Sequence, residues 1–457
     1  MRVLRHLPRF RRAYRQMETL AAHEAWSRAT IEAFQLERIN SVWHHAAAHV
    51  PYYRSLRREC GLPARFSSLD EYRQRMPVLE RFTVRDRHAE FLSERRRPGA
   101  WKRTGGSTGT PMSVYWEHEA HLEMLRTRYR FYAQWGIDIF DRSACLWGHA
   151  ASFAPGLSGM AARIAMPASD RLRDRLRLSA YRLAPSDLRH HLRRLVAFRP
   201  ATLYGYSGAI YLMALEAEAC GLRCDSLRLC VLTGEPSPPQ IVAKIEAVFG
   251  TPAVVEYGST ECGAIAVEGM DRQIRVREDI TAVETVPRDD GQFEIVVSPL
   301  NNPSFPLLRY AIADITDAPL TESASGFAVL ANIAGRSNDL LVTRDGGCLH
   351  ASRLDAFFKF ESPAIRRFHV LQRMDGALRV SLELDRGGAI DVASAEERIS
   401  RLVGGYPVQI ELVNAVPQTK AGKHRLVVSE MATPHTSAVR PVSGGRHRQS
   451  HLSRISA

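Results

Sequence analysis

Short runs of β-branched residues alternate with helical segments through the middle of the chain, and this alternation constrains the fold more than any other feature. Three such runs are LRLCVLTG (227–234), PAVVEYG (252–258) and FEIVVSPL (293–300), and a helical pattern covers 239–249. Strands that alternate with helices predict an α/β fold with a largely parallel sheet. The sequence therefore predicts an α/β core that begins near residue 100.

The region before residue 95 is predicted to be a helical lead-in to this core. Residues 28–50 place Ile31, Phe34, Ile39 and other apolar side chains at helical spacing. Pro51 ends this helix, because proline lacks the backbone N–H and disfavours a helical conformation in the residue before it.

A second pattern begins near residue 338 and predicts a small α+β unit. Its expected elements are a strand at 340–343, a turn at 345–346, a helix at 352–360, a hairpin through Asp375 and Gly376, a helix at 394–403 and a strand at 408–413. The predicted division is a large N-terminal domain (1–337, with 1–95 as the lead-in), a small C-terminal domain (338–430) and a basic tail (431–457). The tail has no apolar periodicity and is predicted to be disordered.

The composition excludes several classes of protein. The net charge of the 457 residues is +13, but residues 1–20 contribute +5 and residues 431–457 contribute +4. The basic residues therefore concentrate at the two ends, which argues against a nucleic-acid-binding groove. No apolar run reaches about 20 residues, so we expect no transmembrane segment, and the basic start of the chain has no secretory signal pattern. The seven cysteines show no zinc spacing, and we expect reduced thiols and a cytoplasmic location.

One stretch rich in Gly, Ser and Thr has the composition of a phosphate-binding loop. The segment TGGSTGTPM covers 104–112, and such residues bring backbone N–H groups and hydroxyls close to an anion. It lacks the Gly-Lys-Ser/Thr ending of a P-loop and the three-glycine spacing of a dinucleotide fold. Taken alone, the stretch fits a polar turn equally well.

Four further segments follow this loop in a fixed order. They are LTGEP (232–236), EYGSTE (256–261), RYAIAD (309–314) with GR (335–336), and PQTKAGKHR (417–425). Together with the loop, they resemble the motifs of the adenylate-forming (AMP-binding) superfamily. The chain looks most like the phenylacetate–CoA ligase branch and its CapK-like relatives in capsular polysaccharide biosynthesis, and HAAAHVPYYRSL (45–56) is also typical of that branch. The resemblance covers about residues 30–430.

The resemblance implies an AMP-forming ligase that binds ATP and Mg²⁺. Such an enzyme makes an acyl-adenylate from a carboxylic acid and then transfers the acyl group to a nucleophile, by positioning and charge neutralisation. It also implies a small C-terminal domain that is mobile and carries Lys423 to the α-phosphate. Glu261 would hold Mg²⁺, and both Lys423 and Glu261 are the expected catalytic residues.

The nucleotide site implied by the resemblance is assembled from all five motifs. Its expected members are Thr104, Gly105, Gly106, Ser107, Thr108 and Gly109 for the phosphates, Gly234, Glu235, Pro236, Tyr257, Gly258, Ser259 and Thr260 around adenine, and Asp314 and Arg336 at the ribose. The acid site would contain Trp147, His149, Tyr206 and Ser207, and aromatic side chains there favour an aromatic acid.

Three positions depart from the family pattern. Met112 stands where many members have lysine, the middle of the ribose motif is altered (310–314), and Asn338 stands where an aspartate is common at the hinge. These changes are compatible with nucleotide binding. They concern the rate of the reaction and the rotation of the small domain.

The resemblance leaves the acceptor and the assembly open. Coenzyme A is the expected acceptor, with the phosphopantetheine thiol of an acyl carrier protein, or an amine, as alternatives, since a basic surface suits both the phosphates of coenzyme A and an acidic carrier protein. A non-catalytic nucleotide-binding protein of the same fold is the competing hypothesis, although retention of both Glu261 and Lys423 argues against it. The oligomeric state is open, and a homodimer is compatible with the sequence.

Overall fold

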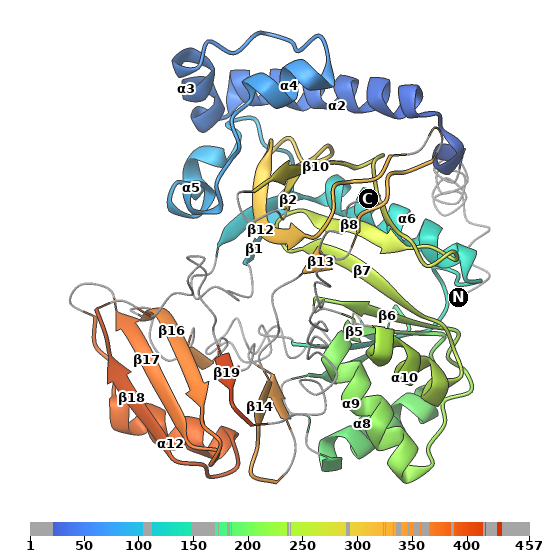
Figure 1. Cartoon of the computed structure of the whole chain (residues 1–457), viewed down its shortest axis with the longest axis vertical. Coiled ribbons are helices and arrows are strands. Elements are labelled where there is room, and N and C mark those ends of the chain that lie inside the picture. Colours follow the sequence, from blue (N-terminus) through green and yellow to red (C-terminus); the bar gives the residue numbers. More distant parts are fainter. Residues whose placement is uncertain are drawn as a thin grey trace, which may run out of the picture.

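The protein has the predicted α/β class, with helices and several sheets in layers (Figure 1). The computed structural model describes residues 22–103, 112–148, 173–180, 185–234, 239–288, 293–322, 326–331, 333–334, 340–345, 348–350, 365–384, 388–414 and 427–431, with a few single positions between these ranges. Within them, no helix is long and apolar enough to cross a bilayer.

Helices dominate the first described part of the chain, as expected. They are η2 (His23–Ala25), α2 (Arg28–His49), α3 (Pro51–Glu59), α4 (Leu69–Arg75), α5 (Arg81–Asp86) and η3 (His88–Phe91). The side chain of Ser27 caps α2 by accepting a hydrogen bond from the Thr30 N–H at 3.2 Å. Pro51 ends α2 as predicted. It also begins α3, because the first turn of a helix does not use the backbone N–H that proline lacks.

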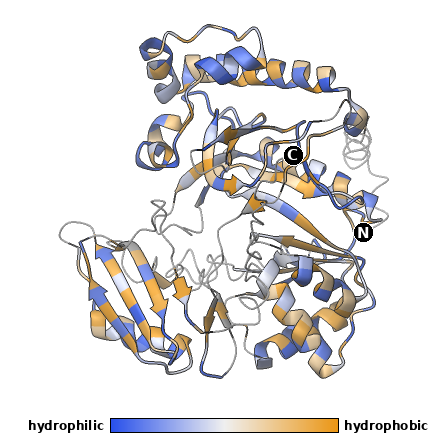
Figure 2. Cartoon of the chain, viewed as in Figure 1, coloured by the Kyte–Doolittle hydropathy of each residue, from blue (hydrophilic) through white to orange (hydrophobic). Residues whose placement is uncertain are grey.

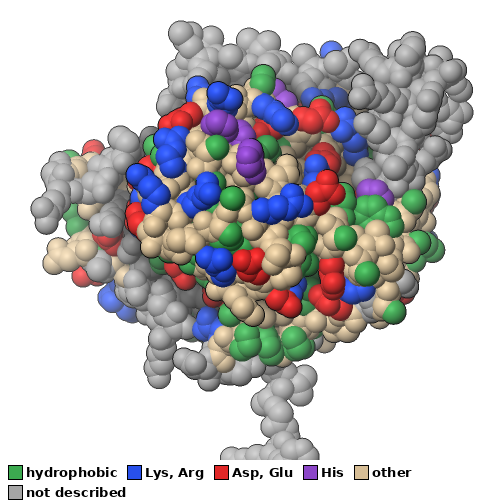
Figure 3. Space-filling model, turned by 90° about the horizontal axis from the view of Figure 1, so that it is seen from above, with side chains coloured by type: hydrophobic (Ala, Val, Ile, Leu, Met, Phe, Trp, Pro, Cys, Tyr) green, Lys and Arg blue, Asp and Glu red, His purple; other side chains and the backbone are tan. Residues whose placement is uncertain are grey.

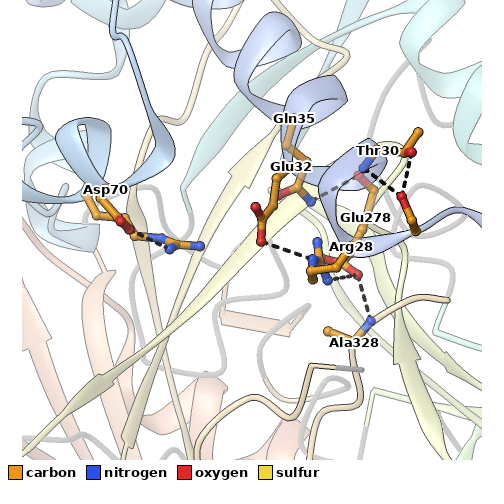
Figure 4. A network of polar contacts seen from close by, with 9 residues as sticks. Arg28, Thr30, Glu32, Gln35, Asp70, Glu278 and Ala328 are labelled. Carbon is orange, nitrogen blue, oxygen red and sulfur yellow. Dashed lines mark hydrogen bonds and ion pairs between the residues drawn. The ribbon is translucent and has the colours of Figure 1, made fainter. Parts of the chain in front are cut away.

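Helix α2 is joined to the rest of the molecule by both polar and apolar contacts. Arg28 donates two hydrogen bonds to the carboxylate of Glu278, at 2.7 and 3.1 Å, and Gln35 donates to the Glu278 carbonyl at 3.1 Å (Figure 4). On the same helix, Trp43 is fully buried against Tyr53 and Phe66. The lead-in therefore shares the core of the large domain. Its outer face carries basic side chains among acidic ones (Figure 3).

A seven-stranded sheet forms the centre of the part of the chain before β10, in the order β4-β3-β5-β6-β7-β8-β9. Its strands are β3 (Ser143–Trp147), β4 (Arg175–Ser179), β5 (Thr202–Tyr206), β6 (Leu229–Thr233), β7 (Ala253–Ser259), β8 (Gly263–Glu268) and β9 (Ile274–Val276). The five strands from β4 to β7 are parallel, and β8 and β9 are antiparallel additions. The predicted strands at 227–234 and 252–258 are β6 and β7, and the largely parallel sheet is confirmed.

Four helices accompany this sheet. They are α6 (His118–Gln134), α8 (Pro185–Phe198), α9 (Ser207–Cys220) and α10 (Pro239–Phe249). Helix α10 has the predicted bounds. Helices α8, α9 and α10 lie together beside β5 and β6 (Figure 1) and pack through an apolar cluster that includes Leu192, Met213 and Ile245.

The third predicted strand, FEIVVSPL, belongs to a different sheet from the one expected. It forms β11 (Phe293–Pro299) in an antiparallel sheet of order β10-β11-β12-β13. The other members are β10 (Thr281–Pro287), β12 (Tyr310–Thr316) and β13 (Ile333–Ala334). No helix separates β10, β11 and β12 in sequence, and consecutive strands joined by short connections pair as antiparallel neighbours. The placement of this run in the parallel sheet was therefore wrong.

A separate hairpin carries the segments that flank the Gly/Ser/Thr stretch. Strands β1 (Gly99–Arg103) and β2 (Ser113–Glu117) pair antiparallel, with Lys102 opposite Val114 and Arg103 opposite Ser113. Residues 104–111 lie outside the described residues. Met112 is buried in the core, so its side chain is not placed to contact a phosphate.

The C-terminal elements form two sheets and one described helix. They are β14 (Leu340–Val342), β15 (Cys348–His350), β16 (Ile365–Gln372), β17 (Leu378–Leu384), α12 (Val392–Leu402), β18 (Val408–Leu412) and β19 (Val427–Ser429). Strands β18, β17, β16 and β19 make a four-stranded sheet whose apolar and polar residues alternate (Figure 2). Gly376, at φ +87°, makes the predicted hairpin turn between β16 and β17.

This C-terminal part has an apolar core of its own, which includes Phe368, Val380 and Ile399. The helix expected at 352–360 falls mostly outside the described residues, although Leu354 and Phe358 are buried in that core. The domain boundary at 337/338 and the tail beyond Met431 also lie outside the described residues, and both stay predictions.

Because Trp43 fills the space between α2 and the core, its truncation should destabilise the whole large domain. We expect Trp43→Ala to lower the free energy of unfolding by about 3–5 kcal/mol, the range for deletion of a buried aromatic side chain. Urea denaturation followed by circular dichroism measures this change. Glu37→Ala, at an exposed position of the same helix, is the control and should change stability by less than about 0.5 kcal/mol. Equal effects of the two substitutions would contradict this account of the lead-in.

Candidate active site

The described members of the predicted site gather at one edge of the central sheet. Trp147 ends β3, Tyr206 ends β5, Gly234 follows β6, and Tyr257 lies near the end of β7. The four strands are parallel neighbours in register, so their carboxyl ends meet at a common edge. In open α/β sheets this edge is where ligands bind.

Two aromatic rings and a glycine form an apolar wall at this edge. The rings of Trp147 and Tyr206 stack with centroids 4.0 Å apart and planes at 23°. Tyr204 also stacks on Trp147, with ring centroids 5.6 Å apart. Gly234 has φ +74°, and a Cβ there would lie 3.0 Å from the Tyr206 ring and 3.6 Å from Trp147. A glycine is therefore required for this close approach.

The predicted residue Ser207 has a structural contact. It begins α9, is fully buried, and its hydroxyl accepts a hydrogen bond from the Ser237 hydroxyl at 2.9 Å. This contact joins the start of α9 to the segment after β6. It supports the wall formed by Trp147 and Tyr206, and a direct contact of Ser207 with an acid stays a prediction.

Two predicted nucleotide residues from different sheets are in direct contact. The Tyr257 hydroxyl donates a hydrogen bond to Oδ2 of Asp314 at 3.0 Å. Tyr257 belongs to β7 and Asp314 to β12. The residue before Asp314, Ala313, has φ +64°, in the left-handed region, and the pairing of β11 with β12 is irregular here. This local irregularity of the altered ribose motif turns Asp314 towards Tyr257.

Glu261 is almost fully buried and is held by two residues that sequence reasoning missed. Its Oε1 accepts a hydrogen bond from Arg81, at the start of α5, and lies 3.5 Å from the hydroxyl of Tyr310 on β12. Arg81 also donates to the Tyr310 hydroxyl at 3.2 Å. Burial alone lowers the pKa of Arg81, but the adjacent Glu261 carboxylate and Tyr310 raise it by more, so the guanidinium stays charged.

The contacts of Glu261 fit the metal role expected for it. Both contacts reach Oε1, which leaves Oε2 as a ligand for a hard cation, and Mg²⁺ prefers one or two carboxylates together with phosphate oxygens. Among the described residues no cluster of three or more His, Cys, Asp or Glu side chains could hold a metal by itself. Phosphate oxygens would have to complete such a site.

The residues between Tyr257 and Glu261 shape the turn after β7. The Ser259 hydroxyl accepts a hydrogen bond from the Cys262 N–H at 3.0 Å. Gly258 lies where the pairing of β7 with β8 shifts, and the Gly263 carbonyl leaves no room there for a side chain. Thr260 presents its carbonyl to the indole N–H of Trp116, at 3.0 Å. The last contact places the β1–β2 hairpin, and hence the entry to the Gly/Ser/Thr stretch, beside Glu261.

A second buried ion pair lies behind the aromatic wall. Arg128 of α6 donates two hydrogen bonds to Glu256, at 2.6 and 2.8 Å, and the hydroxyls of Tyr132 and Tyr204 also donate to that carboxylate at 3.3 Å each. Burial lowers the pKa of Arg128, but Glu256 raises it by more, to well above its ordinary value. This pair connects α6 to the strand that ends in Tyr257.

The other predicted site residues lie outside the described residues. They are Thr104, Gly105, Gly106, Ser107, Thr108, Gly109, His149, Glu235, Pro236, Arg336 and Lys423. Arg81, Tyr310, Arg128 and Trp116 were not predicted, because each is separated in sequence from the motif residue that it contacts. Arg81, in the segment LERFT, carried no motif signal of its own, and Tyr310 was recognised as part of the ribose motif without a predicted contact to Glu261.

Comparison with known proteins agrees with this geometry. Residues 103–287 match a protein family described as "AMP-binding enzyme", and these residues belong to it. The resemblance predicted from the motifs is confirmed: residues 103–287 match this family, and the chain shares the fold of solved CoA ligases.

Two curated proteins are related at low identity. Protein CapK of Staphylococcus aureus is 23% identical over 267 residues, which cover 56% of this chain and 59% of CapK. The phenylacetate-coenzyme A ligase of Thermus thermophilus is 23% identical over 389 residues, which cover 78% of this chain and 81% of that ligase. The chain therefore spans less than two thirds of CapK and about four fifths of the ligase.

Solved structures of 2-hydroxyisobutyryl-CoA ligase share the fold. The structure with 2-HIB-AMP and CoA in the thioesterification state has a TM-score of 0.60 and 20% identity, and the match covers 90% of this chain and 91% of that one. A postadenylation structure with R3-HIB-AMP has a TM-score of 0.56, also at 20% identity, with coverage of 89% and 91%.

The ion pair between Arg81 and Glu261 generates a test by double-mutant cycle. Arg81→Met leaves a buried carboxylate beside no cation, and we expect it to lower the free energy of unfolding by about 3–5 kcal/mol. Glu261→Gln in the Arg81→Met background removes that charge, so the double variant should be more stable than Arg81→Met alone. Urea denaturation of the parent and three variants measures the coupling. Additive losses would show that the two side chains do not interact.

Proposed function

We propose that this protein is an AMP-forming carboxylate ligase that adenylates an organic acid with ATP and transfers the acyl group to a thiol. The observation that carries the proposal is the contact of Asp314, from one motif, with Tyr257, from a second motif that also carries Glu261, beside the hairpin that flanks the Gly/Ser/Thr stretch. This arrangement accounts for a nucleotide site with a face for a base, a carboxylate for ribose hydroxyls and a carboxylate for a metal ion.

The residues of the site have different roles in the first half-reaction, the adenylation of the acid by ATP. Residues 104–109 would grip the phosphates through backbone N–H groups, while Tyr257 and residues 234–236 face adenine. Asp314 would accept hydrogen bonds from the ribose, and Arg336 would contact ribose or phosphate. Glu261 would hold Mg²⁺ through Oε2, and the metal would neutralise charge on the phosphates. Arg81 donates a hydrogen bond to that carboxylate and so holds it in place.

The acid is proposed to be aromatic and to bind against Trp147 and Tyr206, with His149 and Ser207 nearby. The stacked rings support this, because a flat apolar wall suits a flat apolar acid. Within the proposal, Lys423 provides a point charge between the carboxylate and the α-phosphate, which stabilises the charge that develops there. The small domain, predicted at 338–430, would deliver this lysine.

Coenzyme A is the proposed acceptor. The related Thermus thermophilus protein is a coenzyme A ligase, and a structure with the same fold holds CoA in a thioesterification state. The thiol of an acyl carrier protein, or an amine, are the alternatives within the same class. Both ATP and coenzyme A are cytoplasmic metabolites, so we propose a cytoplasmic enzyme that acts on a small molecule and not on nucleic acid, either alone or as a homodimer.

A non-catalytic nucleotide-binding protein of the same fold is the second candidate. The altered ribose motif supports it, since Ala313 has a strained backbone conformation where the family pattern differs. The contact between Tyr257 and Asp314 speaks against it, because the ribose carboxylate is still turned towards the adenine residue.

Acid-dependent exchange of pyrophosphate into ATP tests the proposal directly. With Mg²⁺ and a panel of aromatic and aliphatic acids, at least one acid should support exchange, because the adenylation step is reversible. Glu261→Gln should lower the exchange rate by about 100-fold or more, since it removes the metal-binding charge. The variant must keep the parent's circular dichroism spectrum. Absence of exchange with every acid, despite ATP binding, would favour the non-catalytic candidate.

The two half-reactions should respond differently to changes at Lys423 and at the hinge. If the small domain rotates about residues 337–339, Lys423→Ala should slow adenylation by about 100-fold or more and leave transfer from presynthesised acyl-adenylate close to the parent rate. Asn338→Pro should keep adenylation and slow transfer, because proline restricts the backbone at the hinge. Rapid-quench measurement of each half-reaction separates them. Equal losses in both half-reactions for Lys423→Ala would contradict the two-state account.

A further inference from the structure

A partly buried lysine beside the proposed site has no carboxylate partner among the described residues. Lys102 lies on β1, and its ammonium donates a hydrogen bond to Nδ1 of His121, on α6, at 3.2 Å. The same ammonium lies 4.5 Å from the centre of the Trp116 ring on β2. Lys102 is paired with Val114, and Trp116 lies two positions after Val114 on the same strand. Because side chains two positions apart point to the same face, Lys102 and Trp116 share one face of the hairpin.

The charged groups that lower the pKa values of Lys102 and His121 are all cations. Burial, with a smaller effect from Arg128, lowers the pKa of Lys102 to about 8. Burial also lowers the pKa of His121 to about 4, and Lys102, Arg128, Arg173 and His118 add to that effect. His121 is therefore neutral and accepts the lysine's hydrogen bond. Arg128 itself is bound to the carboxylate of Glu256.

A partly buried ammonium without an adjacent anion lowers the stability of the fold unless a bound ligand compensates. Burying an ammonium without an anion is unfavourable, and a bound anion would replace the lost hydration. An exposed position on a short hairpin would avoid this cost, yet Lys102 is drawn inward over the ring of Trp116.

The position of Lys102 and His121 relative to the proposed active site indicates which ligand an anion bound there would be part of. Trp116 also donates to the Thr260 carbonyl, so the Lys102 face of the hairpin lies against the turn that carries Glu261. On the other side, Arg128 contacts the ring of Tyr204, which stacks on Trp147. Lys102 and His121 are thus linked through Trp116 to the turn that carries Glu261, and they feel the charge of Arg128, which contacts the aromatic wall.

We propose that Lys102 and His121 form an anion subsite for a second acidic group on the carboxylic acid that this protein activates. The inference rests on the proposed function and narrows its substrate class to acids that carry two anionic groups. The group that is not adenylated, a carboxylate or an equivalent oxyanion, would accept a charge-assisted hydrogen bond from Lys102.

Calorimetric binding of matched acids tests the subsite without requiring turnover. The pairs are succinate and butyrate, isophthalate and 3-methylbenzoate, and 4-carboxyphenylacetate and 4-methylphenylacetate, in which a methyl group replaces one carboxylate. At least one diacid should bind the parent protein about tenfold or more tightly than its methyl partner. Lys102→Met, which keeps the length of the side chain, should remove this difference, and Lys102→Arg should retain much of it.

A matched control separates local charge from net charge. Lys244→Met removes a lysine that pairs with Glu218 on the α9–α10 surface, so it changes the net charge equally and should leave the diacid preference intact. The KM for ATP, measured in the exchange assay, should stay within about threefold of the parent value in Lys102→Met.

The outcomes distinguish this inference from the proposed function. If no diacid binds the parent more tightly than its partner, if the preference survives Lys102→Met, or if that variant raises the KM for ATP instead, the subsite is wrong. The last result would assign Lys102 to the triphosphate. If diacids bind in a Lys102-dependent manner but no acid supports pyrophosphate exchange, the subsite stands and the ligase proposal fails.

Discussion

The buried contact between Arg81 and Glu261 joins three parts of the chain that are distant in sequence. Arg81 comes from the helical lead-in, Glu261 from the turn after β7, and Tyr310, which contacts both, from the antiparallel sheet. A carboxylate this deeply buried requires a cation beside it. The helices before residue 95 therefore do more than cover the core, since they supply the cation that pairs with Glu261 at the edge of the site.

The parallel register of β3, β5, β6 and β7 explains how the rest of the site assembles. Parallel neighbours end on the same edge, so residues from four separate segments become adjacent without any long-range sequence signal. Gly234 permits the contact of its segment with the aromatic wall, and the irregular backbone at Ala313 brings Asp314 from a second sheet to Tyr257. Backbone geometry, and not side-chain length, limits these approaches.

Positive charge near the site is arranged in two ways that have different consequences. Arg81 and Arg128 are bound to carboxylates, so each is neutralised and serves to position its partner. Lys102 has no such partner in the described part of the chain, and its neighbour His121 is held neutral by burial and by surrounding cations. A site that contains both kinds of cation suits a substrate whose reacting carboxylate and second acidic group are bound by different residues.

The sequence by itself determined the α/β class, the helix at 28–49, strands β6 and β7, helix α10 and the order of the five motifs. These depend on local periodicity, proline and glycine positions and short segments, which are properties of neighbouring residues. Only the tertiary structure decided that 293–299 joins an antiparallel sheet, that Arg81 and Tyr310 contact Glu261, and that Lys102 lies over the Trp116 ring. Contacts between residues that are distant in sequence have no periodic signature, because they arise from how the sheets and helices pack.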